Sequence, residues 1–523
     1  MAGVMSFWYG FVRRLTLLSV VLAAPVAAQD VELRSLDGDV RLEGTLTAFD
    51  GTYYQIDTIY GPLTVAAEGV ACAGPGCPDL ISFTAEARIA GEVNVTETLL
   101  PDLLQGFAAD RAMALRGPEP RNGAIAYEMT RQDNSIAARF IVMPGNSDTG
   151  FLALLNNEAD MAVTLRLPTR GEQRADRASA PDDPQLSRRV RVIALDALVP
   201  LVAPDNPIDA ISLDDLTAVF RGEIDNWQDL GGPDAPIARH MLRADNGMAQ
   251  SFATLALGTS EGDLTPMITY HASAATLAAA VARDSFALGV SGRSVASAVR
   301  ILPLLGACGL IQAADVDAIK AEDYPLTVPV HVYLAPRRLP QLVQDFLDWT
   351  ETAAAESIVA ASGYVDQSLT RTPLERQGMR LANAIAAAGD EVPLAQLQSL
   401  VRRLRGAERL SATMRFSDGS SDLDALSRAA VARLAAAIES GAFDGRRLIF
   451  VGFSDSAGAA EINLRVAQRR AEAVRDAVQN AADAATPGRV TFEIAAFGEA
   501  MPMACEETEQ GRAVNRRVEV WLD

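Results

Sequence analysis

Histidine and cysteine are scarce in this chain of 523 residues, which has three histidines and four cysteines. His240, His271 and His331 stand far apart, in none of the patterns of a zinc site or a Ser-His-Asp hydrolase. The segment GVSGRS at 289–294 also departs from the G-x-S-x-G pattern of a nucleophile elbow. The sequence therefore predicts no metal site, no cofactor and no enzymatic activity.

Basic residues are also in short supply, since 46 lysines and arginines face 67 aspartates and glutamates. The resulting net charge of −21 repels the phosphates of nucleic acids and of anionic lipids. We therefore exclude nucleic acid and anionic membrane surfaces as partners.

Long hydrophobic runs are missing beyond the first thirty residues, so we expect no transmembrane segment in the mature chain. Near the start, two arginines precede the apolar segment 15–24 and a stretch of small residues that ends at Ala28. This order is typical of a secretory signal peptide, which we predict over residues 1–28. Gln29 stands where a lipoprotein would have a cysteine, so we expect no lipid anchor. The signal peptide itself predicts export to the periplasm.

The four cysteines of an exported chain indicate disulfides. Cys72 and Cys77 flank the turn-forming residues Ala-Gly-Pro-Gly, and we predict a disulfide between them. Cys308 and Cys505 are far apart in the sequence, and they either pair between domains or remain free thiols.

Changes in sequence texture predict a signal peptide followed by four further regions. Short alternating segments separated by Asp-Gly and Gly-Pro turns over residues 29–80 predict a small all-β barrel, which we interpret as a docking or spacer module. Alternating strand and helix patterns over 81–367 predict an α/β domain, and 368–409 reads as a helical linker. Residues 410–523 predict a second α/β domain, so the fold class is multidomain.

The last region contains a candidate binding pocket. An apolar β-type run, 448–451, ends in Gly-Phe-Ser-Asp, which places Asp455 at the mouth of a strand. A helical pattern over 461–478 carries Arg470. A strand–loop–helix turn can bring this carboxylate and this guanidinium to opposite walls of one pocket, where they would hold a ligand with an ammonium and a carboxylate. Taken singly, Asp455 would only cap the turn and Arg470 would be a solvated helix charge.

The segment resembles the C-terminal domain of the OmpA family, which grips peptidoglycan through meso-diaminopimelate. The matching residues are Gly452-Phe453-Ser454-Asp455, Asn463, Arg470-Ala471, Gly498-Glu499, Pro502 and Asn515-Arg516-Arg517-Val518-Glu519. The resemblance implies that Asp455 holds the diaminopimelate ammonium and Arg470 its carboxylate. Ser454 and Asn463 would complete the pocket.

Five segments of the region 81–367 form a second pattern: ADMAVTLRLP at 159–168, the long stretch 193–232, RADNGMAQSF at 243–252, ALGVSG at 287–292 and EDYPL at 322–326. Through these segments the region resembles the phosphate-binding protein of ABC importers. The resemblance implies two α/β lobes that close on an anion, held by helix N-termini, hydroxyl groups and arginine. The candidate anion-binding residues are Arg166, Arg243, Asn246, Thr96, Ser147 and Thr149. The hydroxyl clusters at Thr96 and at Ser147 are equally typical of plain helix N-caps.

Two departures concern the ligand. Leu165 replaces a serine of the family pattern, and Asn246-Gly247-Met248 replaces Ser-Gly-Thr, so hydroxyl donors are lost. Phosphate, another small anion or no small ligand all remain open. The sequence therefore predicts an exported, peptidoglycan-anchored protein that binds or senses a solute such as phosphate. The alternative is a ligand-free envelope scaffold whose two-lobed domain docks a protein partner.

Overall fold

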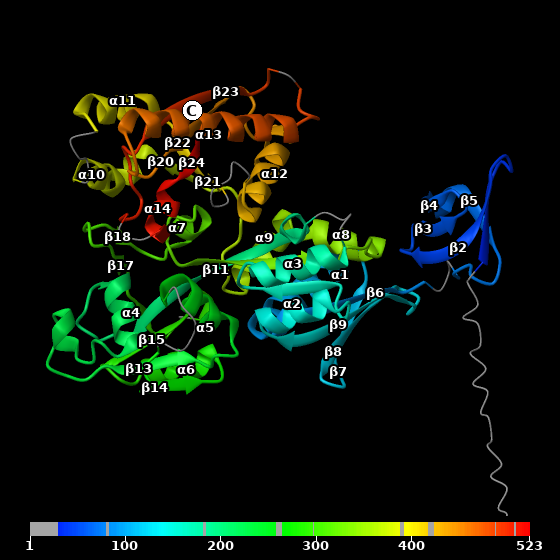
Figure 1. The fold of residues 1–523 in the computed structure, drawn as a ribbon, viewed down its shortest axis with the longest axis horizontal. Coiled ribbons are helices and arrows are strands. Elements are labelled where there is room, and N and C mark those ends of the chain that lie inside the picture. The colour runs from blue at the N-terminus through cyan, green and yellow to red at the C-terminus, as the bar shows by residue number, and fades with distance from the viewer. Residues whose placement is uncertain are drawn as a thin grey trace, which may run out of the picture. The chain divides into compact units, whose positions relative to one another are not determined.

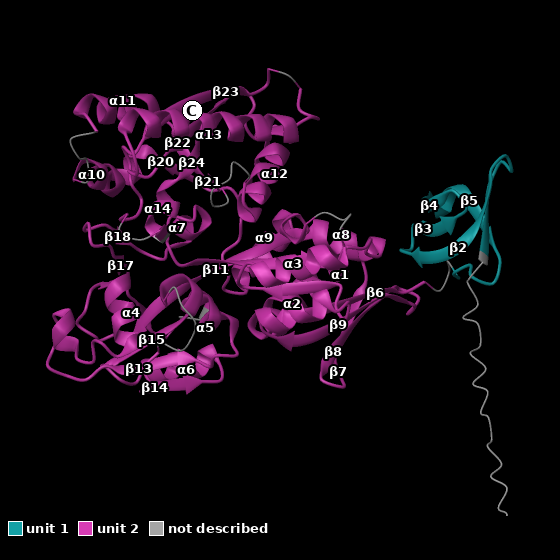
Figure 2. Cartoon of the chain, viewed as in Figure 1, with its two compact units in different colours: residues 1–81 teal, residues 82–523 magenta. Residues whose placement is uncertain are grey.

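The computed structural model describes residues 30–79, 83–180, 185–257, 264–295, 298–386, 392–416, 423–486, 488–506 and 509–523. The predicted signal peptide, residues 1–28, lies outside the described residues. The chain divides into two compact units, Met1–Ile81 and Ser82–Asp523 (Figure 2).

The first unit is one antiparallel sheet with the strand order β4-β3-β2-β1-β5. Its strands are β1 (Asp30–Ser35), β2 (Arg41–Phe49), β3 (Tyr53–Thr58), β4 (Gly61–Ala66) and β5 (Val70–Ala73). The sheet buries Val31, Leu33, Tyr54 and Ile56. Barrel closure is not confirmed, because β4 and β5 are the two outer strands and do not pair with each other within the described residues. The Cys72–Cys77 disulfide is present and begins on β5.

The second unit contains a two-lobed α/β domain built on an 11-stranded sheet (Figure 1). Along the main path the strand order is β14-β13-β15-β11-β19-β10-β6-β9-β8-β7. The first lobe contains β6 (Ala85–Glu92), β7 (Ala114–Arg121), β8 (Ala124–Thr130), β9 (Ile136–Gly145), β10 (Met161–Thr164) and β19 (Thr327–Leu334). The second contains β13 (Ala238–Leu242), β14 (Ile268–His271), β15 (Ala287–Gly292) and β16 (Arg300–Ile301).

The strand β11 (Val190–Val202) joins the two lobes. Its first half pairs with β19, and its last five residues pair with β15. Its sequence, VRVIALDALVPLV, is a nearly continuous apolar run because residues 192–202 are all buried. One strand therefore sets both lobes on a common sheet.

Helices cover both parts of this sheet (Figure 1). In the first lobe they are α1 (Leu100–Asp110), α2 (Ser147–Leu155), α3 (Arg170–Ser179), α8 (Gln341–Trp349) and α9 (Ala353–Ala361). In the second they are α4 (Leu213–Arg221), α5 (Gly247–Phe252) and α6 (Ala274–Val281). A small sheet of β12 (Ile211–Ser212), β17 (Leu304–Leu305) and β18 (Ile311–Gln312) precedes α7 (Val316–Lys320).

The C-terminal α/β domain has the strand order β20-β21-β24-β22-β23. The strands are β20 (Arg371–Pro373), β21 (Glu408–Arg415), β22 (Arg447–Phe453), β23 (Thr491–Gly498) and β24 (Arg517–Leu522). One face packs against α12 (Ala425–Glu439) and α13 (Ala460–Ala481). A short helix, α14 (Glu509–Asn515), precedes the last strand.

The segment predicted as a helical linker forms α10 (Gly378–Ala386) and α11 (Leu394–Leu404). Both helices pack on this C-terminal sheet. Leu397, Leu400 and Leu404 join a core cluster with Val451 and Trp521. The helical segment therefore covers the face of the sheet opposite α12 and α13.

A cluster of buried charges lies under this sheet. Glu519 on β24 is 0% exposed and accepts hydrogen bonds from Arg517 Nε at 2.8 Å and Arg380 Nη2 at 2.5 Å. Arg409 Nε lies 3.3 Å from Glu519 Oε2, and Arg409 also donates to Asp323 of the two-lobed domain. Burial alone raises the pKa of Glu519, but the charges of the three arginines outweigh it and hold the pKa well below its usual range. The cluster therefore carries its charges inside the protein.

Removing the central carboxylate should be costly. We predict that Glu519→Gln lowers the free energy of unfolding of the C-terminal domain by about 3–5 kcal/mol, because it removes the counter-charge of Arg380 and Arg517 and one of the two carboxylates that pair with Arg409. Glu493 is a matched control, since its side chain is 35% exposed and pairs with Arg447 at 3.0 Å. Glu493→Gln should cost less than about 1 kcal/mol. Urea unfolding of both full-length variants tests this, and equal losses would contradict it.

Candidate functional site

The residues of the predicted binding site in the C-terminal domain lie where β22 meets α13. Gly452 on β22 lies so close to this helix that a Cβ atom would stand 2.0 Å from the carbonyl oxygen of Ala467. Only glycine permits this approach of strand and helix. The close packing places the loop after β22, which carries Asp455, beside the helix that carries Arg470.

Asp455 and Arg470 lie in each other's electrostatic field without a direct ion pair. Asp455 Oδ2 accepts a hydrogen bond from Arg516 Nη1 at 2.9 Å. Arg470 stacks over the ring of Phe416 at 5.4 Å and makes no hydrogen bond within the described residues. Burial and the nearby charge of Arg516 lower the pKa of Arg470, and Asp455 partly offsets this. A half-buried guanidinium without an acceptor can bind a carboxylate from outside the protein.

The other two predicted residues are buried at the same junction. Asn463 donates from Nδ2 to Glu499 Oε2 at 2.8 Å, which ties α13 to the end of β23. Ser454 donates its backbone N–H to Gly498 O at 2.9 Å, and its buried hydroxyl has no partner in the described part of the chain. Both residues therefore lie at the junction of α13 with the ends of β22 and β23, and their part in ligand binding stays a prediction.

The structure also shows a supporting loop that the motif alone did not reveal. Glu506 accepts hydrogen bonds from Ser456 N at 2.8 Å and from Asn515 Nδ2 at 2.7 Å. Buried Asn515 also bonds the backbone of Met503 and of Ala504. The asparagine that opens the Asn-Arg-Arg motif therefore organises the loop next to Asp455. Its place in the motif was the available signal, but its role depends on contacts made by the folded chain.

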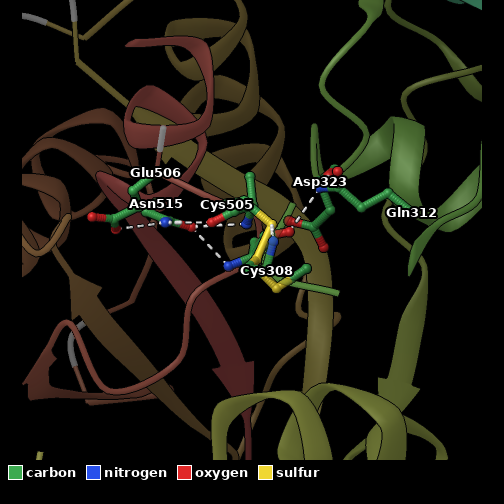
Figure 3. The surroundings of a disulfide bond; sticks show 8 residues. Cys308, Gln312, Asp323, Cys505, Glu506 and Asn515 are labelled. Carbon is green, nitrogen blue, oxygen red and sulfur yellow. Dashed lines mark hydrogen bonds between the residues drawn. A yellow bond between two sulfur atoms is a disulfide. The ribbon is translucent and has the colours of Figure 1, made fainter. Parts of the chain in front are cut away.

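A disulfide fixes this loop to the two-lobed domain. Cys308 and Cys505, whose pairing the sequence left open, are bonded to each other (Figure 3). Gln312 Nε2 adds hydrogen bonds to Met503 O at 2.7 Å and to Asp323 O at 3.1 Å. The loop beside Asp455 is therefore held covalently from the neighbouring domain.

The candidate anion site lies where two helix N-termini face each other across the lobes. Asn146 caps α2 by accepting from Thr149 N, and its own N–H donates to Thr149 Oγ1. Asn246 caps α5 by accepting from Met248 N at 3.0 Å. Thr96 Oγ1 donates to the carbonyl oxygen of Glu92. Of the predicted donors, Thr149, Asn246 and Thr96 thus serve the backbone of their own segments.

The two predicted arginines are engaged elsewhere. Arg166 stacks on Phe151 and forms ion pairs with Asp148 and Glu172, the latter at 2.7 Å. The side chain of Arg243 is 62% exposed and lies 3.4 Å from Asp245. The structure therefore gives Arg166 two internal counter-charges and leaves Arg243 facing solvent.

Glu92 occupies the space between the two helix N-termini. It ends β6, is fully buried, and accepts a hydrogen bond from Ser147 Oγ at 2.5 Å. A Cβ atom on Gly247, the first residue of α5, would stand 2.0 Å from both of its carboxylate oxygens. Burial raises the pKa of Glu92 to about 7, against the lowering effect of Ser147, the backbone N–H of Gly247 and the charge of Arg166.

Direct contacts between the lobes surround Glu92. Asn146 Nδ2 donates to Asp245 O at 3.1 Å, and Gln250 Nε2 donates to Asp148 Oδ2 at 3.1 Å. Ser251 Oγ donates to Leu165 O at 3.0 Å, so the carbonyl of the leucine that replaces the family serine bridges the lobes. The lobes are closed upon each other.

Comparison with known proteins identifies both domains. Residues 128–352 match the model of the PBP superfamily domain, and residues 415–516 match that of the OmpA family. The chain joins a PBP superfamily domain to an OmpA family domain. Both families are binding and anchoring domains. The matches lie inside the predicted domains 81–367 and 410–523, whose boundaries remain predictions.

Individual relatives match one domain at a time. Outer membrane porin F of Pseudomonas fluorescens is 43% identical over 72 residues, 14% of this chain and 21% of that protein. The phosphate-binding protein PstS of Bacillus subtilis is 27% identical over 190 residues, 34% of this chain and 59% of that protein. An ABC-type phosphate transport receptor from Vibrio cholerae has a TM-score of 0.41 and 20% identity, covering 53% of this chain and 99% of that structure. The chain thus spans only part of each curated relative.

Neither a membrane-spanning helix nor a metal-binding cluster is found in the part of the chain that the structure describes. No helix there combines the length and the apolar character needed to cross a membrane. Nor do three or more His, Cys, Asp or Glu side chains gather there into a group that could hold a metal ion.

The buried carboxyl in the PBP domain should make stability depend on pH. Because folding raises the pKa of Glu92 from 4.5 to about 7, its contribution to stability is complete below pH 4.5 and is lost as the pH rises through 7. The loss should reach roughly 3 kcal/mol at pH 8. Glu92→Gln, which cannot ionise, should be more stable than the wild type at pH 8 and similar at pH 5.

Calorimetric melting between pH 5 and 8 measures this difference. Arg166 and Tyr364, whose charges interact with that of Glu92, keep their charge states in this range, and burial raises the pKa of Tyr364 further. Exposed Glu97, five residues away, gives the matched control Glu97→Gln. An unchanged pH profile in Glu92→Gln would show that Glu92 does not titrate abnormally.

Proposed function

We propose that this protein is a non-enzymatic component of the periplasm that is anchored to peptidoglycan through its OmpA domain. Asp455 binds the ammonium group of meso-diaminopimelate, and Arg470 binds its carboxylate. The observation that carries the proposal is the state of Arg470, which is half-buried beside Asp455 and has no acceptor within the described residues.

The acidic half of the pocket also keeps one oxygen unused. Arg516 uses only Oδ2 of Asp455, so Oδ1 accepts no hydrogen bond from the described residues. Arg516 holds this carboxylate in place while leaving one oxygen for the ligand. A charge-assisted hydrogen bond at each end would fix a zwitterionic side chain in one orientation.

Similarity to part of an outer membrane porin supports a place in the cell envelope. The predicted signal peptide, which lies outside the described residues, would direct export. Attachment of the OmpA domain to peptidoglycan would hold the PBP domain next to the cell wall.

Two uses of the PBP domain compete. Similarity to a phosphate-binding protein supports binding of phosphate or another small anion. The closed lobes and the carboxylate between them favour the second use, a scaffold that docks a protein partner. We therefore propose an anchored docking module in preference to a phosphate sensor.

Sedimentation with purified sacculi tests the anchor. Asp455→Ala and Arg470→Ala should each weaken pelleting about tenfold or more, because each removes one charge-assisted hydrogen bond of about 1.5–3 kcal/mol. Arg465→Ala is the matched control, since Arg465 is an exposed arginine on the same helix. Pelleting of either pocket variant at the control level would contradict the assignment.

A further inference from the structure

The donors that an oxyanion would use between the lobes of the PBP domain are aimed at a group of the chain itself. The first residue of α2, Ser147, donates its hydroxyl to Glu92 Oε1. The first residue of α5, Gly247, lies against both carboxylate oxygens. Hydroxyl groups and backbone N–H groups at helix N-termini are the usual ligands of a bound oxyanion. Here they face a carboxylate instead.

The space at this point is already filled. Glu92 and Ser147 are both fully buried, and a single methyl group on Gly247 would overlap the carboxylate. Ser147 Oγ also accepts from Leu165 N at 3.0 Å, so its one hydroxyl proton is directed to Glu92. A phosphate ion could reach these donors only by displacing the Glu92 side chain.

The same carboxylate touches both lobes. Ser147, in the first lobe, donates a hydrogen bond to it, and Gly247, in the second lobe, packs against it. Asn146 and Gln250 add interlobe hydrogen bonds near α2 and α5, and Ser251 of α5 bonds the carbonyl oxygen of Leu165, whose N–H in turn bonds Ser147. In a two-lobed binding domain a ligand would provide this link.

We propose that Glu92 is a built-in substitute for a ligand: its carboxyl group takes the place of a small oxyanion between the lobes and prevents phosphate from binding. The proposal concerns the PBP domain alone and does not depend on peptidoglycan attachment. It makes Glu92 the residue that sets the ligand specificity of the cleft.

Removal of the carboxylate should create an anion site. The full-length Glu92→Ala variant loses the carboxyl group and should gain a cavity beside the Ser147 hydroxyl and the N-terminus of α5. Its melting temperature should be lower than that of the wild type, and formate, acetate or phosphate should raise it in a saturable manner. The wild type and the control Glu97→Ala should show no saturable response to any of the three ions in thermal melting or in titration calorimetry.

Two results would overturn the proposal. One is saturable binding of phosphate to the wild type, and the other is a folded Glu92→Ala variant that responds to none of the three ions. If Glu92→Ala does not fold, isosteric Glu92→Gln replaces it. The proposal then requires that Glu92→Gln, whose side chain fills the same space, gives no phosphate heat in titration calorimetry, as in the wild type. Saturable phosphate binding to Glu92→Gln would overturn it. Pelleting with sacculi should be unaffected by Glu92→Ala, so failure here is distinguishable from failure of the anchoring proposal.

Discussion

Charge that is shut away from water must find its counter-charge within the protein, and this constraint shapes the second unit of the molecule. Glu519 lies under the OmpA sheet with Arg380, Arg409 and Arg517 around it. Arg409 also reaches Asp323 in the PBP domain, and Arg415 pairs with Glu322 beside it at 3.0 Å. The domains therefore share one set of buried ion pairs, and separating them would expose or strand several charges. These ion pairs fix the PBP domain to the OmpA domain.

The two candidate sites differ in how completely the chain satisfies its own polar groups. In the OmpA domain Arg470 and one oxygen of Asp455 have no internal partner within the described residues, so the pocket keeps unused binding capacity. In the PBP domain Ser147 and the N-terminus of α5 meet Glu92, and the predicted hydroxyl and amide groups cap their own helices. Polar groups at the two candidate sites thus differ: those of the OmpA domain are partly unpartnered within the described residues, and those of the PBP domain are engaged by the chain itself.

Local motifs carried most of what the sequence could predict. The Gly-Phe-Ser-Asp turn and the helix after it brought Asp455, Asn463 and Arg470 to one junction, because all three lie within a single strand–loop–helix unit. The α/β character of residues 81–367 followed from their strand and helix pattern, and the two lobes followed from the resemblance to the phosphate-binding protein. The position of Glu92 did not, since it depends on Gly247, which is distant in the sequence and on the other lobe. An acidic residue directly after the small apolar residues of β6 was a weak signal. Likewise, nothing local indicated that α10 and α11 cover a sheet formed later in the chain.

The two disulfides differ greatly in the length of chain that they close. Five positions separate Cys72 from Cys77, whereas 197 separate Cys308 from Cys505. A short ring closes with little loss of chain entropy and needs no distant partner. Cys72 and Cys77 come first in the chain, so they can form their disulfide before Cys308 is available. Their thiols then no longer compete for Cys308 or Cys505. Cys505 is then the one remaining partner for Cys308, so the order of the four cysteines along the chain favours the correct pairing.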